Sequence, residues 1–94
     1  MSNRNNVKTV VVEVLNVETG ERSQPIYEAY GYEKFLKFVE FYVECAEGGA
    51  VIAWVRGYDY NDEHGNTRKV AEAFVNVKGE VFDLMPEPEL VSAV

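Results

Sequence analysis

The chain has few cysteines and no long apolar segment, and these absences exclude several large classes of protein. It has one cysteine, Cys45, and therefore no intrachain disulfide framework of the kind that staples small secreted domains. No stretch approaches the about 18 consecutive apolar residues of a membrane-spanning helix. The first residues, MSNRNNVK, are polar and lack the apolar segment of a secretory signal. These absences together predict a cytoplasmic protein.

Residues with catalytic or metal-binding chemistry are also scarce. No serine, cysteine or second histidine stands at a spacing that pairs a nucleophile with a base, so we predict no catalytic residue and no enzyme activity. Residues 59–65 resemble a calcium loop superficially. Counted from Asp59, however, the sixth residue is His64 where an EF-hand has glycine, and the twelfth is Val70 where it has glutamate. We therefore predict no metal site and no cofactor.

Basic residues are few relative to acidic ones. The 94 residues include 16 acidic and 9 basic side chains, which give a formal net charge of −7. Such a charge repels nucleic acid and anionic lipid, so neither is expected to bind directly. It would attract a protein with a basic surface, although an acidic balance also serves solubility alone.

The N-terminal half predicts a hairpin. Residues 7–17, VKTVVVEVLNV, are rich in β-branched side chains and apolar on both faces, which is typical of a central strand. Gly20 favours a tight turn, because glycine adopts positive φ without steric cost. The returning strand spans 22–30, and Pro25 places it at an edge or a bulge because proline has no N–H to donate.

A helix is predicted between the glycines, over residues 31–49. Its core-facing side would comprise Phe35, Leu36, Val39, Tyr42, Val43 and Ala46. Its apolar arc covers roughly 220° of the wheel, whereas covering one sheet needs little over 100°. The surplus residues Phe38, Phe41 and Cys45 would then be covered by the chain's own C-terminal strand or would form a homodimer interface.

The C-terminal half predicts further strands over residues 50–60 and 67–77, with a short one at 80–84. The resulting fold is α+β, a two-layer ββαββ(β) arrangement with one helix packed on a four- to five-stranded, mostly antiparallel sheet. A β-grasp-like order, with the first and last strands parallel at the centre, and a plain meander both fit. The single domain would span 7–84, between a disordered N-terminus (1–6) and a flexible tail (85–94).

Tyrosines beside carboxylates mark a candidate partner-binding surface. Tyrosine supplies rigid contact area at binding hot spots, and carboxylates would pair with lysine or arginine. The candidate residues are Tyr58, Asp59, Tyr60, Asp62, Glu63 and Glu72.

These features favour a small, acidic, non-enzymatic protein-binding module. In size and charge, though in no motif, the chain resembles phage-encoded inhibitors such as anti-CRISPR and DNA-mimic proteins. That resemblance implies an inhibitor that docks on a basic, nucleic-acid-binding surface of its target. The alternative is a homodimer that binds a small molecule in a pocket at the helix flank or the sheet edge.

Overall fold

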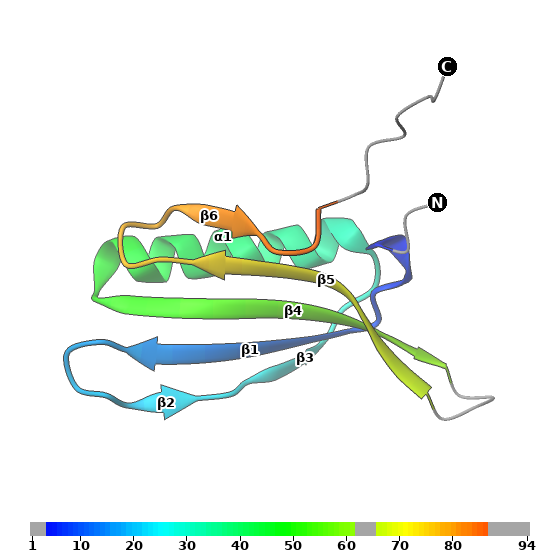
Figure 1. Cartoon of the computed structure of the whole chain (residues 1–94), viewed down its shortest axis with the longest axis horizontal. Helices are drawn as coiled ribbons and strands as arrows, with labels where there is room; N and C mark the ends of the chain where they lie inside the picture. The colour runs from blue at the N-terminus through cyan, green and yellow to red at the C-terminus, as the bar shows by residue number, and fades with distance from the viewer. Residues whose placement is uncertain (1–3, 62–65, 87–94) are drawn as a thin grey trace, which may run out of the picture.

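A computed structural model describes residues 4–61 and 66–86 of the chain. The elements, in chain order, are η1 (Arg4–Asn6), β1 (Thr9–Asn16), β2 (Arg22–Ser23), β3 (Ile26–Glu28), α1 (Tyr32–Gly48), β4 (Val51–Asn61), β5 (Asn66–Val75) and β6 (Val81–Asp83). One helix packs against an antiparallel sheet, which confirms the predicted α+β class (Figure 1). Within the described residues, no helix is long and apolar enough to cross a membrane.

The strand order is β2-β1-β4-β5-β6, and β3 also pairs with β1. The central position of β1 is therefore confirmed, as is the edge position of the strand around Pro25, which separates β2 from β3. The β-grasp alternative is wrong, because β1 pairs antiparallel with β4 and the last strand, β6, lies at the far edge. A plain meander is also wrong, because β4 is placed beside β1 and not beside β3.

The length of α1 explains this order. Its 17 residues, at about 1.5 Å each, span about 26 Å. The eight residues of β1, at about 3.3 Å each, span the same distance. The helix starts beside the beginning of β1 and carries the chain back to its end, so that β4 starts opposite the end of β1, with Val51 paired to Asn16.

The core lies between α1 and one face of the sheet. Alternate residues of three strands are buried there: Val10 and Val12 of β1, Ala53 and Val55 of β4, and Ala71, Ala73 and Val75 of β5. On the helix, Phe35, Val39, Tyr42 and Ala46 are buried, as predicted. Leu36 was expected in the core but is 40% exposed, and Val43, two turns further along the same side of the helix, is only half-buried, so this side lies at the margin of the helix–sheet contact.

Gly57 of β4 allows close contact between the layers. A Cβ atom at this position would lie 2.9 Å from Cγ2 of Val7 and 3.2 Å from Cδ2 of Phe35. Both of those side chains are almost completely buried. The pairing of β4 with β5 shifts register directly after Gly57.

The N-terminal segment differs from the expected disordered terminus from Arg4 onward. Residues 4–6 form a short 3-10 helix, and Val7 is only 1% exposed. The Arg4 guanidinium forms an ion pair with Asp83, donates a 2.8 Å hydrogen bond to the Met85 carbonyl, and lies 4.7 Å from the centre of the Tyr32 ring. Arg4 thus ties the first described residues to the last ones.

Candidate interaction surface

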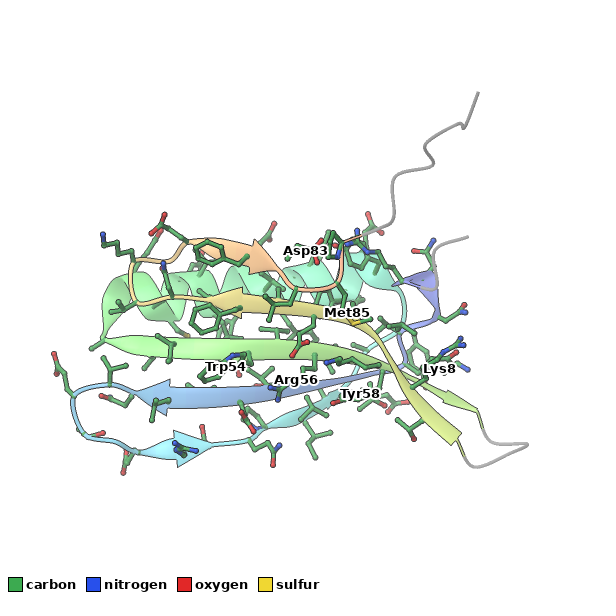
Figure 2. The ribbon with its side chains drawn as sticks, in the orientation of Figure 1. Lys8, Trp54, Arg56, Tyr58, Asp83 and Met85 are labelled. Atoms are coloured by element: carbon green, nitrogen blue, oxygen red, sulfur yellow. The ribbon has the colours of Figure 1, made fainter. Side chains whose placement is uncertain are left out.

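The face of the sheet opposite α1 carries a row of aromatic rings across three strands. Trp54 of β4 pairs with Phe74 of β5, which pairs with Phe82 of β6. The ring centroids are 5.0 Å apart in the first pair and 6.3 Å in the second. We call Trp54, Phe74 and Phe82 the aromatic row. Because Ala53 and Val55 point into the core, strand alternation places Trp54 on the opposite face (Figure 2).

The aromatic row is not part of the core. Phe82 is 47% exposed, and Trp54 and Phe74 are half-buried. Within the described residues, the one α-helix covers the other face of the sheet, so no second layer packs over these rings. Aromatic rings left at a surface mark sites of contact, because they bury large area at little conformational cost.

A network of charged side chains continues the same face toward the other end of β4. Nε of Arg56 donates a 2.7 Å hydrogen bond to Oε2 of Glu72, and Nζ of Lys69 lies 2.7 Å from Oε1 of the same carboxylate. Arg56 also lies 3.6 Å from Glu13. Figure 2 shows Trp54, Arg56 and Tyr58 in sequence along β4.

The hydrogen bonds in this network shift the pKa values of Arg56 and Glu72. The hydrogen bond with Glu72 raises the pKa of Arg56 above its usual value. Partial burial alone would raise the pKa of Glu72, but the hydrogen bonds from Lys69 and Arg56 outweigh it and the net shift is downward. Arg56 and Glu72 are therefore both ionised at neutral pH, and the Glu72 carboxylate is already opposed by two cations of this chain.

The structure does not bring the partner-binding residues expected from the sequence together on one face of the sheet. Tyr58 and Glu72 share the face of the aromatic row, and both are half-buried. Asp59 follows Tyr58 and points to the opposite face, where it forms ion pairs of 3.1 Å with Lys8 and 3.7 Å with Arg68. The Tyr60 side chain, Asp62 and Glu63 lie outside the described residues.

Reasoning from sequence missed Phe74 and Phe82 as surface residues and did not join them to Trp54. Their assembly depends on the register between β4, β5 and β6, which no short-range pattern encodes. One signal was present. In β4, small side chains at positions 53, 55 and 57 alternate with Trp54 and Arg56, and an arginine beside a tryptophan on one face indicates a face turned toward solvent.

The proposed dimer residues lie along one flank of α1. Phe38 is half-buried and stacks on Tyr27 of β3 with centroids 4.4 Å apart. Phe41 is 52% exposed, and Cys45 is half-buried. Since β6 lies at the opposite edge of the sheet from β3, the C-terminal strand does not cover this flank.

Two hollows accompany these surfaces. One, of about 320 Å³, lies on the helix flank and is lined by Tyr27, Lys34, Lys37, Phe38 and Phe41. The other, of about 300 Å³, lies at the sheet edge beside Trp54 and is lined also by Glu13, Val14, Leu15, Arg22, Ser23 and Gln24.

Across residues 4–61 and 66–86, no group of three or more histidine, cysteine, aspartate or glutamate side chains is placed to hold a metal ion. Comparison of the chain with protein-family models, with curated proteins and with solved structures finds no match. The geometry therefore defines a class of surface, an aromatic row bordered by a network of ion pairs within the chain. The comparisons give no relative from which a function could be transferred.

Proposed function

We propose that this chain is a non-enzymatic protein-binding module that contacts its partner through the aromatic row. The observation that carries the proposal is the position of these rings outside a core that is already closed by α1 on the other face. A row of partly exposed rings across three strands provides the large, rigid contact area typical of interface hot spots. The neighbouring ion network would form part of the polar rim.

The partner would be a protein with a basic surface, and a reducing, cytosolic setting would suit the lone Cys45. The net charge of −7 supports this choice of partner, because opposite charges steer two proteins together over long range. Glu72 and Asp59 would not be the anchors, since both are neutralised by cations of this chain. The anchors would be the rings, and the remaining carboxylates would accelerate encounter. Covering a nucleic-acid-binding surface of the partner would make the chain an inhibitor.

The test compares three variants of matched chemistry. Trp54→Ala and Phe82→Ala remove rings from the row, whereas Leu36→Ala removes an apolar side chain from the helix layer whose exposure is close to that of Phe82. Proteins captured from a lysate by the tagged wild type at low salt are identified by mass spectrometry and titrated individually. We expect Trp54→Ala to weaken the affinity of the specific partner by about 30-fold, as for a hot-spot residue, while Leu36→Ala binds normally.

Salt dependence checks the electrostatic part of the proposal. The association rate with that partner should fall as ionic strength rises, while the dissociation rate changes little. A partner whose affinity is unaffected by Trp54→Ala and Phe82→Ala would show that the row is not the contact surface. Circular dichroism of each variant separates loss of binding from loss of fold.

The alternative function is binding of a small molecule, which the two hollows favour. Both volumes stand at the lower end of the range for ligand pockets, and each combines an aromatic ring with charged side chains. A metabolite screen by thermal shift distinguishes the two functions. A ligand that raises the melting temperature of the wild type, with the effect lost in Trp54→Ala or Phe41→Ala, would favour this alternative.

A further inference from the structure

The outward side of α1 has the residue pattern of a helix that packs against another helix. Centred on Phe41, residues spaced three and four apart lie on one side of the helix; these are Lys34, Lys37, Phe38, Phe41, Glu44, Cys45 and Gly48. We call them the helix outer face. Apart from half-buried Phe38 and Cys45, all of them are exposed. Alternating spacings of three and four are those by which two helices interlock side chains.

The charges on this face are segregated along the helix. Lys34 and Lys37 precede Phe41, and Glu44 follows it. Within the described residues, none of these three side chains forms an ion pair. The face therefore has a basic half and an acidic half, with an aromatic ring between them.

This order of charges is poorly suited to an isolated helix. The N-terminal end of a helix carries partial positive charge and the C-terminal end partial negative charge. The first turn of α1 contains Lys34, whose repulsion is offset only by Glu33, and its last turn contains no basic residue. A second helix running in the opposite direction would compensate both the segregated charges and the dipole.

We propose that a second copy of this chain occupies the helix outer face, with its α1 packed antiparallel to the first about a two-fold axis beside Phe41. Such an interface is self-complementary, because each contact occurs twice. The basic half of each helix then lies against the acidic half of the other. A parallel arrangement would instead place lysine against lysine and glutamate against glutamate.

The register follows from helix geometry. At about 1.5 Å per residue, Lys37 lies about 6 Å before Phe41 and Glu44 about 4.5 Å after it, so Lys37 of one copy comes level with Glu44 of the other. At about 100° per residue, both lie on the same side of Phe41, about 40° and 60° away. A two-fold axis perpendicular to both helices leaves this side of Phe41 on the same side of the interface in both copies. Lys37 of one copy therefore meets Glu44 of the other.

The other side of Phe41 is apolar and is matched in the same way. Phe38 and Cys45 lie about 60° and 40° from Phe41 on that side, and Phe38 of one copy comes opposite Cys45 of the other. The two Phe41 rings lie level with each other beside the two-fold axis, and the hollow of about 320 Å³ that Tyr27, Phe38 and Phe41 line lies next to them. The half-exposed Phe41 would thereby become buried.

The dimer would have a defined shape. Because α1 covers one face of the sheet (Figure 1), pairing through the helices gives four layers, with the two sheets outermost. The two aromatic rows would face in opposite directions. If they bind partners as proposed above, the dimer would be bivalent and could hold two partner molecules at once. The dimer itself does not depend on that function.

The experiment uses charge reversal and sedimentation equilibrium. Wild type should show a concentration-dependent monomer–dimer equilibrium at concentrations up to about 1 mM. Lys37→Glu replaces both attractive contacts by repulsive ones, as does Glu44→Lys, and each should raise the dimer dissociation constant by about tenfold or more. An equimolar mixture of the two variant proteins should associate again, as should the double variant Lys37→Glu/Glu44→Lys, because each restores opposite charges at both contacts.

Matched controls change the same charge elsewhere. Lys78→Glu and Glu18→Lys alter exposed side chains outside α1, and their dimers should dissociate as in wild type. A wild type that stays monomeric over the whole concentration range overturns the proposal. So does a dimer that responds equally to Lys37→Glu and Lys78→Glu, or one that the double variant does not restore. None of these outcomes bears on whether Trp54 is needed for partner binding.

Discussion

Substituting alanine for Gly57 tests how closely the helix and the sheet approach each other. The added Cβ would lie 2.9 Å from Cγ2 of Val7 and 3.2 Å from Cδ2 of Phe35. Carbon atoms are most favourably about 3.5 Å apart or more, so Val7 would have to move by about 0.6 Å. Both neighbours are buried and packed on all sides, so neither can move freely.

The expected cost follows from two opposing terms. Overpacking a core by one methyl group costs about 1–3 kcal/mol. Replacing glycine also restricts the unfolded chain, which stabilises by about 0.4–1 kcal/mol. We therefore expect Gly57→Ala to lower the free energy of unfolding by about 1–2 kcal/mol. Gly48→Ala provides the control, because a Cβ there meets nothing within 4 Å, and should stabilise the protein by about 0.5–1 kcal/mol.

Urea denaturation of a double-mutant cycle identifies the cause. Val7→Ala alone should cost about 2–3 kcal/mol in lost burial and cavity formation. In Val7→Ala/Gly57→Ala the new methyl group occupies part of the vacated space, so the double variant should be at least about 1 kcal/mol more stable than the sum of the single effects predicts. Strict additivity, or a Gly57→Ala variant as stable as wild type, would refute the steric explanation.

Two further predictions concern titratable groups. Because the pKa of Glu72 is lowered in the folded protein, the unfolded chain takes up a proton at this residue first as the pH falls. The contribution of Glu72 to stability is therefore complete above about pH 4.5 and is lost as the pH falls through the folded pKa. Glu72→Gln should cost about 1 kcal/mol at neutral pH and should flatten this acid dependence in urea titrations. Burial, followed by the 2.9 Å hydrogen bond with Tyr27, raises the pKa of Tyr42 well above its usual value, so the folded protein keeps a proton that the unfolded chain loses and stability should fall as pH rises above about 10. Tyr42→Phe should remove this alkaline loss, seen by ultraviolet absorption and thermal melts, and should cost about 0.5–1.5 kcal/mol at neutral pH.

The sequence was sufficient to place the helix and the strands because their signals are local. Gly31 and the glycines at 48 and 49 bound α1 to within a residue, and the run of β-branched residues in 7–17 identifies β1. The same reasoning misplaced Leu36, because a helical wheel gives the direction of a side chain but not the width of the surface beneath it. It also failed to assemble the aromatic row, whose members come from three strands up to 28 residues apart.

The sequence by itself determined the α+β class, the polar and apolar sides of α1, the choice of an edge or a bulge for the strand around Pro25, and the order of charges along the helix outer face. These depend on periodicity and on backbone chemistry within one element. Tertiary structure alone decided that β1 pairs with β4, that Trp54, Phe74 and Phe82 lie side by side, and that Glu72 and Asp59 are neutralised by the chain's own cations. Such contacts depend on strand register and on the position of one layer over another, which are set by the packing of the whole core and not by any single segment.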